Sequence, residues 1–202
     1  MKIICIGRNY ADHAEELNNE VPKEPVIFLK PDTALLPPKS PFFIPDFTND
    51  VHHEVELVVR INRVGKHIEE RFAHRYYDKI SLGIDFTARD VQAACKAKGL
   101  PWEKAKAFDG SAPVGDWISI DNKDINNIKI HLLKNGEIVQ EGNTSEMLFT
   151  VDRLIAEVSK YFTLKIGDLI FTGTPSGVSA VKSNDVLEAF LDDELLLKVR
   201  VK

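Results

Sequence analysis

Short strand-like runs separated by turn signals are the feature that most constrains how this chain can fold. Apolar runs of this kind occur at residues 2–7, 26–31, 52–63, 81–86, 128–142, 168–178 and 186–202. Only about three stretches have helical composition, and they do not alternate regularly with the strands. The pattern favours a β-rich mixed α+β fold over the βαβ repetition of a Rossmann-type sheet.

The helical stretches have recognisable start and stop signals. They lie at residues 10–17, 87–101 and 150–162. In the second, Thr87 is the predicted N-cap, with Asp90 three residues later in a variant of the capping box. Gly99 and Pro101 are typical of a helix end, so this helix is predicted to stop before them.

Turn chemistry organises the rest of the chain. Asn135 and Gly136 suit a type I′ turn, which predicts a β-hairpin over residues 128–142. Residues 186–202 form a second predicted hairpin. Five prolines between residues 31 and 50 predict an extended, irregular segment. We find no internal linker or repeat, so the sequence predicts one domain covering residues 1–202.

Composition excludes several classes of partner. The net charge is -5, and no Lys/Arg cluster with interleaved aromatic residues occurs, so nucleic acid is not an expected partner. No apolar run approaches the roughly 20 residues of a membrane span, and the first ten residues do not resemble a signal peptide. Cys5 and Cys95 lie outside any metal-binding spacing, which suits free thiols in a reducing compartment. We therefore expect a cytoplasmic protein without a membrane partner.

Two carboxylates share one face of the predicted strand HHEVELVVRINR. Side chains alternate with period two along a strand, so Glu54 and Glu56 point the same way and repel unless solvent, a proton or a cation separates them. Asp85 lies in the apolar run SLGIDF, where an unpaired acid is costly. Together the three would form an oxygen site for Mg²⁺ or Mn²⁺, and His52 as a further ligand would favour Zn²⁺ or Fe²⁺. The alternative is a solvated strand face.

His13 and Glu16 are a candidate general-base pair. Residues three apart share a helix face, and a histidine beside a carboxylate is a common arrangement for moving protons. The alternative is a surface helix with ordinary charges. The polar loop that follows, with its two prolines, is a candidate mobile segment.

Two further stretches have the composition of binding sites. The Gly-rich run FTGTPSGV, residues 171–178, can expose backbone N–H groups to an anion, although a simple turn is the alternative. Lys104 and Lys106 stand near Trp102 and Phe108. A lysine buried beside apolar bulk needs an anionic partner, whereas one on the surface buries only its alkyl stem.

These stretches resemble one protein family when they are taken in order. The motifs GRNYADH, FLKP, HHEVEL, GIDFTARDVQ, KGLPW, AKAFDGSAP and FTGTPSGV span nearly the whole chain. Together they resemble the fumarylacetoacetate hydrolase family, in particular its short single-domain branch of acylpyruvate hydrolases and oxaloacetate decarboxylases. The resemblance implies a mixed β-sandwich roll like the family's C-terminal domain, with a few short helices, usually as a homodimer.

The resemblance also implies roles for individual residues. Glu54, Glu56 and Asp85 would hold Mg²⁺ or Mn²⁺; His13, Glu16 and Lys106 would be catalytic; Arg8, Gln92 and Thr174 would contact substrate. The helix with His13 would act as a lid. In the loop after it, Asn18, Asn19 and Lys23 are candidate specificity contacts.

The implied activity is metal-dependent cleavage of the carbon–carbon bond of acylpyruvates through a metal-bound pyruvate enolate. Decarboxylation of oxaloacetate would use the same enolate. The alternative is an isomerase, hydratase or tautomerase of 2-hydroxymuconate-type 2-oxo diacids. A 2-oxo acid binding module without turnover is a further alternative. In every case the expected partner is a small 2-oxo acid.

Overall fold

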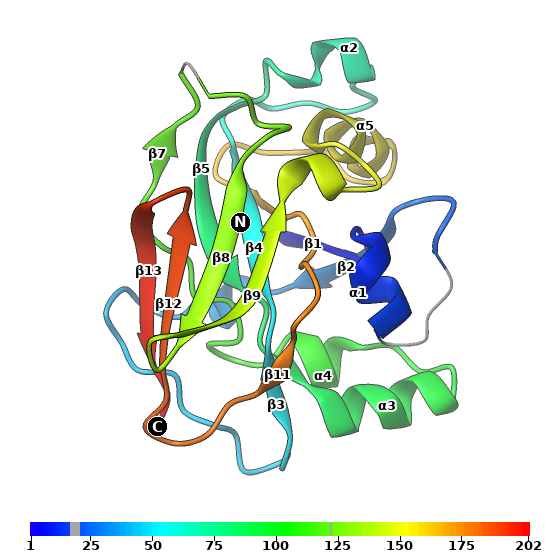
Figure 1. Cartoon of the computed structure of the whole chain (residues 1–202). Helices are drawn as coiled ribbons and strands as arrows, with labels where there is room; N and C mark the ends of the chain where they lie inside the picture. Colours follow the sequence, from blue (N-terminus) through cyan, green and yellow to red (C-terminus); the bar gives the residue numbers. More distant parts are fainter. Residues whose placement is uncertain (17–20, 122) are drawn as a thin grey trace.

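The structure is a computed structural model that describes residues 1–16, 21–121 and 123–202, with backbone alone at residues 13–15 (Figure 1). The helices are α1 (Ala11–Glu16), α2 (Glu70–Ala73), α3 (Arg89–Ala97), α4 (Glu103–Lys106) and α5 (Val151–Tyr161), with 3-10 turns at Asp32–Ala34 and Thr144–Glu146. None of the helices in this described part has the length and apolar character of a membrane span.

Three sheets make up the β structure. The largest has the order β2 (Val26–Lys30), β1 (Ile3–Gly7), β10 (Leu169–Phe171), β4 (Val55–Ile61), β5 (Tyr77–Ile84), β7 (Ile118–Ser119). A four-stranded sheet has the order β13 (Glu194–Arg200), β12 (Val186–Leu191), β8 (Lys129–Lys134), β9 (Glu137–Asn143). The smallest consists of β11 (Ser179–Ala180), β3 (Val51–His53) and β6 (Thr87–Ala88). Only β1 and β10 pair in parallel among these described strands, so the predicted β-rich mixed α+β fold is confirmed.

The main hydrophobic core lies between the two larger sheets. Val55, Leu57 and Val59 alternate along β4 onto this core and are fully buried, facing apolar residues of β8, β12 and β13. The four-stranded sheet covers one face of the larger sheet in Figure 1, which is the arrangement of a β-sandwich. Helix α5 closes one end with Leu154 and Ile155, and α3 and α4 lie at the other.

Several local predictions are confirmed. The β8–β9 hairpin turns at Asn135 and Gly136, whose φ values of 56° and 87° suit a type I′ turn. Helix α3 ends before Gly99, which takes the left-handed conformation at φ 62°. Cys5 and Cys95 are both buried free thiols.

The predicted cap of helix α3 is wrong. Thr87 lies in β6, and its hydroxyl donates to the backbone oxygen of Asp85 at 3.2 Å. The N-cap is Ala88, which offers no side-chain hydrogen bond. The Asp90 carboxylate instead accepts from the Thr48 hydroxyl at 2.5 Å, because the strand pairing of β6 with β3 brings the segment before β3 close to this helix.

Candidate active site

Three carboxylates meet where two strands end. The predicted strand 52–63 breaks at Glu54 into β3 and β4, and the antiparallel register of β4 with β5 pairs Val55 with Ile84. Asp85 follows directly after β5, so it lies opposite Glu54, and its backbone N–H donates to the Glu54 backbone oxygen at 2.8 Å. One carboxylate oxygen each from Glu54, Glu56 and Asp85 lies within 4.8 Å of the other two.

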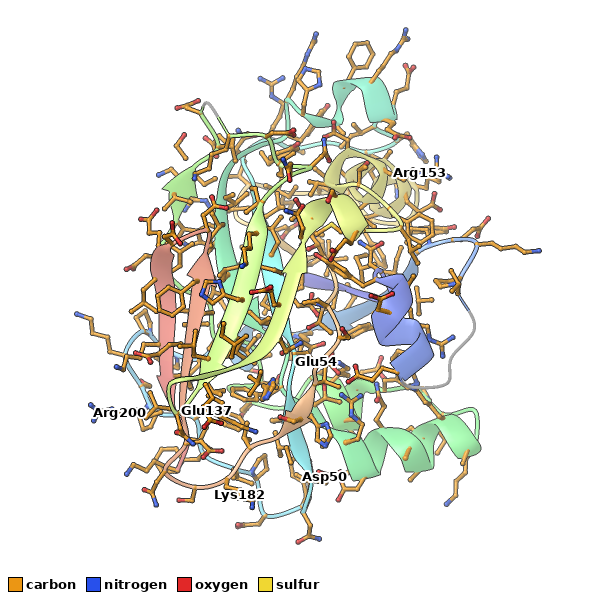
Figure 2. The ribbon with its side chains drawn as sticks, viewed as in Figure 1. Asp50, Glu54, Glu137, Arg153, Lys182 and Arg200 are labelled. Carbon is orange, nitrogen blue, oxygen red and sulfur yellow. The ribbon has the colours of Figure 1, made fainter. Side chains whose placement is uncertain are left out.

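All three carboxylates are buried, with relative exposures of 4%, 2% and 0% in chain order. In Figure 2, Glu54 lies near the middle of the view, whereas Lys182 and Arg200 lie toward its edge. Buried carboxylates are costly unless protonated, paired or bound to a cation. The alternative of a solvated strand face is therefore wrong for this pair of glutamates.

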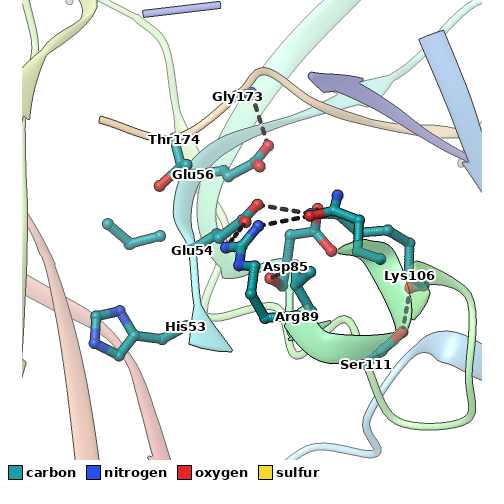
Figure 3. A network of polar contacts seen from close by, with 12 residues as sticks. His53, Glu54, Glu56, Asp85, Arg89, Lys106, Ser111, Gly173 and Thr174 are labelled. Atoms are coloured by element: carbon teal, nitrogen blue, oxygen red, sulfur yellow. Dashed lines mark hydrogen bonds and ion pairs between the residues drawn. The ribbon is translucent and has the colours of Figure 1, made fainter. Parts of the chain in front are cut away.

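Side-chain cations surround two of the three acids (Figure 3). Lys106 Nζ lies 2.7 Å from Glu54 Oε2 and 2.6 Å from Asp85 Oδ2. Lys30 Nζ lies 2.7 Å from Asp85 Oδ1, and Arg89 Nη2 lies 2.5 Å from Glu54 Oε1. Burial opposes the charge on Lys106, but Asp85 and Glu54 outweigh it and hold the pKa of its ammonium above the usual range. Lys106 is therefore a positively charged hydrogen-bond donor.

Glu56 has a different environment. Its carboxylate accepts a hydrogen bond from the Gly173 backbone N–H at 2.7 Å, and no ion pair with it occurs within the described ranges. Burial, followed by the charges of Asp85 and Glu54, raises the pKa of Glu56 well above its usual value. A third buried acid without a cation of its own in the described part of the chain, beside two others, is a donor set that suits a hard divalent ion.

Gly173 can approach Glu56 because it has no side chain. Its φ is 98°, in the left-handed region, and a Cβ there would lie 2.7 Å from the Cβ of the buried Asn9. The amide of Asn9 bridges two segments, since its Nδ2 donates to the Thr172 and Phe149 oxygens at 2.7 and 3.0 Å. The loop after β10 is thus fixed with the Gly173 N–H toward Glu56.

A cavity opens onto the carboxylates, and all three predicted substrate contacts line it. These are Arg8, Gln92 and Thr174. Gln92 is 5% exposed, and its amide oxygen accepts from Arg89 Nη1 at 2.7 Å. Lys104, by contrast, is exposed, so of the two lysines in its helix only Lys106 reaches the site.

Sequence reasoning missed three cations that line or support this cavity. Lys30 is 2% exposed and also donates to the Lys106 backbone oxygen and, at 2.9 Å, to Ser111 Oγ. Arg89 and Lys96 line the cavity from α3. Partial burial, followed by the charges of Arg8 and Arg89, lowers the pKa of Lys96. A lysine closing an apolar strand-like run was the available signal for Lys30; nothing in the sequence singled out Lys96.

The predicted His13–Glu16 pair is described only in part. Both residues belong to α1, and the side chain of His13 lies outside the described residues, as do Asn18 and Asn19. The Glu16 carboxylate accepts from the Gly177 backbone N–H at 3.1 and 3.3 Å. Two N–H groups of the Gly-rich loop therefore donate to carboxylates of the chain itself, those of Glu56 and Glu16, and the binding of a separate anion stays a prediction. Lys23 is exposed.

His52 is not part of the acidic group. Its Nε2 lies 2.9 Å from Asp50 Oδ1, and no histidine joins the carboxylate cluster found among the described residues. The break at Glu54 ends the strand alternation that would have placed His52 beside the glutamates. The donor set is therefore all-oxygen, which suits Mg²⁺ or Mn²⁺ better than Zn²⁺.

Comparison with known proteins agrees with this geometry. The family profile described as fumarylacetoacetate (FAA) hydrolase C-terminal matches residues 2–201. The chain is 46% identical over 201 residues to "Oxaloacetate tautomerase FAHD1, mitochondrial" of Bos taurus, covering 99% of this chain and 91% of that protein. It is 46% identical over 189 residues to "Oxaloacetate decarboxylase, mitochondrial" of Dictyostelium discoideum, covering 93% and 87%.

A solved structure of a similar protein has the same fold. Fumarylpyruvate hydrolase from Pseudomonas aeruginosa, in complex with Mn²⁺ and pyruvate, superposes with a TM-score of 0.94 at 34% identity. The match covers 100% of this chain and 89% of that one. The fold predicted from the sequence motifs is therefore confirmed, and the relatives are enzymes of 2-oxo acids.

Proposed function

Because the chain belongs to the fumarylacetoacetate hydrolase family, we propose that it is a metal-dependent enzyme that converts short 2-oxo acids through their enol or enolate forms. One observation carries the proposal: Lys106, a buried ammonium, lies within 2.7 Å of Glu54 and Asp85 in a cavity that Glu56 also lines. Such a site combines a place for a cation with a donor for developing negative charge.

Glu54, Glu56 and Asp85 would hold Mg²⁺ or Mn²⁺. Their oxygen donors, burial and proximity fit such an ion, and the similar Pseudomonas protein was solved with Mn²⁺ and pyruvate. When bound, the ion would act as a Lewis acid that polarises the 2-oxo carbonyl of the substrate. The choice between Mg²⁺ and Mn²⁺ is a matter for measurement, because both ions prefer the same ligands.

The chain's own cations would bind and stabilise the substrate. Lys106 would donate a hydrogen bond to the oxygen that becomes negative as the enolate forms. Arg8, Arg89 and Lys96 carry positive charge on the same cavity, and together they suit a substrate with two carboxylates. This excess of cations favours a 2-oxo diacid such as oxaloacetate.

Oxaloacetate could react in two ways at this site. In tautomerisation, a proton leaves carbon 3 and a proton is added to the 2-oxo oxygen, so that keto and enol forms interconvert. In decarboxylation, the bond from carbon 3 to the distal carboxylate breaks, CO₂ leaves, and the electron pair remains as pyruvate enolate, which then takes a proton at carbon 3. Both produce negative charge near Lys106, and neither requires an activated water.

Hydrolysis of acylpyruvates is the second candidate, favoured by the similarity to a fumarylpyruvate hydrolase. Water would add to the distal carbonyl carbon, and the carbon–carbon bond to the pyruvate unit would then break to give a carboxylic acid and pyruvate enolate. Glu16, with His13, would remove the proton from water. The Glu16 carboxylate is held on the Gly177 N–H, so hydrolysis would require it to turn toward the substrate.

We also propose that the protein is a homodimer. Phe43 and Phe47 are 68% and 55% exposed, and Phe47 packs on Phe108 with the ring centroids 5.5 Å apart. Asp46 and Lys104 line the hollows around these rings, so residues of opposite charge would face each other when the patch meets a second copy of itself across a two-fold axis. Light scattering should show a dimer, and Phe43→Ser with Phe47→Ser should give a monomer if this patch is the interface.

The cellular location and the macromolecular partners of the protein are further proposals. We propose a cytoplasmic location, although the names of the two relatives above place those proteins in mitochondria. Cell fractionation would decide between the two locations. We propose no nucleic acid partner, because the net charge is -5. We also propose no membrane partner, because no apolar run in the sequence approaches the roughly 20 residues of a membrane span.

A turnover panel would test the enzyme assignment. The substrates would be oxaloacetate, acetylpyruvate, fumarylpyruvate and a 2-hydroxymuconate-type diacid, each with Mg²⁺, Mn²⁺ and EDTA. Metal-dependent turnover that is lost in Glu56→Gln would support the proposal. Glu16→Gln separates the two candidates, because it should stop hydrolysis but leave decarboxylation in part. Calorimetric Mg²⁺ binding without turnover of any substrate would refute the enzyme and favour a binding module.

A further inference from the structure

A buried glutamine behind the cavity has an amide orientation that its neighbours fix. Gln140, in β9, is 1% exposed, and its Oε1 accepts from the Val55 backbone N–H at 3.0 Å. Its Nε2 donates to the Pro175 backbone oxygen at 2.9 Å and to Thr174 Oγ1 at 2.8 Å. A backbone N–H can only donate and a carbonyl can only accept, so the opposite amide orientation is excluded.

This orientation fixes the tautomer of a buried histidine. His53 Nδ1 lies 2.8 Å from Gln140 Oε1, which can only accept, so Nδ1 carries the proton. His53 Nε2 lies 2.8 Å from Ser179 Oγ and, in the neutral ring, accepts the serine proton. Lys134 Nζ donates to the same Oγ at 2.9 Å and to the Ala180 oxygen at 3.1 Å. Every hydrogen bond therefore has a defined direction.

The bond that Gln140 Nε2 donates determines which hydrogen bonds remain for the Thr174 hydroxyl. Thr174 is 3% exposed and lines the cavity with the carboxylates, and its Oγ1 already accepts from Gln140. Its own proton has one described protein acceptor, the Pro175 oxygen at 3.4 Å, which is beyond the usual O–H···O distance of about 2.5–3.0 Å. The hydroxyl proton is therefore available to a ligand in the cavity.

We propose that Gln140, held by the Val55 N–H, the Pro175 oxygen and His53, occupies one acceptor lone pair of the Thr174 hydroxyl and leaves its proton to donate to a carboxylate or oxo oxygen of the substrate. The inference rests on the proposed function, since it takes the ligand to be a 2-oxo acid. Gln140 is a positioning residue that acts through Thr174, and His53 donates to Gln140 from the side away from the cavity.

A double-mutant cycle tests whether Gln140 acts through Thr174. Oxalate, a compact dicarboxylate, would be titrated calorimetrically into the Mg²⁺-loaded wild type, Gln140→Glu, Thr174→Val and the double variant. The carboxylate in Gln140→Glu could only accept, so the Thr174 proton would turn toward it, and oxalate affinity should fall about 10- to 100-fold. Thr174→Val should have a similar effect, and the double variant should bind no worse than either single variant.

Controls separate this role from a structural one. Thr144 is also buried, and its Oγ1 accepts from the Ile128 N–H at 2.9 Å outside the cavity, so Thr144→Val should lower the Tm but leave the oxalate Kd unchanged. If Gln140→Glu does not fold, the cycle would use Gln140→Met, with an expected loss of about 3- to 10-fold. Effects that multiply in the double variant, or an unchanged Kd in Gln140→Glu, would overturn the proposal.

A ligand-free measurement keeps the inference separate from the proposed function. Long-range ¹H–¹⁵N correlation spectra report which ring nitrogen of His53 carries the proton, and the expected result is Nδ1–H. An Nε2–H tautomer of His53 would overturn the proposed hydrogen-bond directions, whatever the substrate is. Wild-type protein that binds no oxalate and turns over no 2-oxo acid would instead refute the proposed function. The tautomer of His53 alone would then test the proposed hydrogen-bond directions.

Discussion

Replacing Lys106 with methionine should reveal how the buried acids depend on positive charge. The substitution keeps the length and apolar stem of the side chain but removes an ammonium that is 3% exposed and lies 2.7 and 2.6 Å from Glu54 and Asp85. Removing one partner of a buried ion pair costs up to about 3–5 kcal/mol, and this is an upper bound here because Arg89 and Lys30 still pair with Glu54 and Asp85. For a chain of this size that corresponds to a fall in Tm of up to about 6–20 °C in EDTA.

Divalent metal should reverse much of this loss. An ion held by Glu54, Glu56 and Asp85 would restore positive charge next to the two acids that Lys106 neutralised. The Tm difference between the variant and the wild type should therefore shrink in millimolar Mg²⁺. Turnover of oxaloacetate should stay low, with kcat reduced by about 10²–10³, because the donor to the enolate oxygen is missing.

Lys104 provides a matched control in the same helix. It is exposed and lies two residues earlier, so Lys104→Met should change stability by no more than about 0.5 kcal/mol. Differential scanning fluorimetry with EDTA and with Mg²⁺, together with steady-state kinetics, provides all the measurements. A Tm deficit in Lys106→Met that is as small as that of Lys104→Met, or that is the same with and without Mg²⁺, would show that the charge argument is wrong.

Three further predictions follow from particular contacts. Gly173→Ala should destabilise the fold by at least about 1–3 kcal/mol and weaken Mg²⁺ binding measured by calorimetry, since φ is 98° and the added Cβ would meet Asn9. As a control, Gly99→Ala, with φ 62° and open space around it, should cost less and leave Mg²⁺ binding intact. Burial lowers the pKa of His53 to about 4, so the unfolded chain binds a proton that the folded chain does not, and urea denaturation should show up to about 3 kcal/mol lost between pH 6.5 and 4. His53→Gln should flatten that pH dependence. Lys96→Ala should raise the KM for dianionic oxaloacetate about two- to fivefold and change it less for monoanionic acetylpyruvate; equal effects on both substrates would contradict the proposed role of Lys96.

Much of the local structure follows from short sequence patterns. The Asn135–Gly136 turn, the apolar face of α5 and the stop at Gly99 depend on residues close together in the chain. Such patterns also predicted that the fold is β-rich. The Thr87 cap failed because a strand pairing, which a local pattern does not contain, took that residue into β6.

The acids of the site could be predicted from the sequence, but the cations that pair with them could not. Sequence patterns suggested Glu54, Glu56 and Asp85 as neighbours, and the register of β4 with β5 explains why they meet. The sequence alone did not show that Lys30 and Arg89 neutralise these acids, since they come from β2 and α3.

Sequence by itself determined the strand-rich architecture and the residue types of the acidic group, because alternation, turns and caps are local properties of the chain. Tertiary structure alone decided which cations face these acids and which groups contact the Thr174 hydroxyl. Both depend on contacts between segments far apart in sequence: Gln140, in the four-stranded sheet, reaches Thr174 in the loop after β10, and His53 reaches Ser179 across 126 residues. Direction in a hydrogen-bond network is set by the donors and acceptors that converge in space, and only the folded chain brings these together.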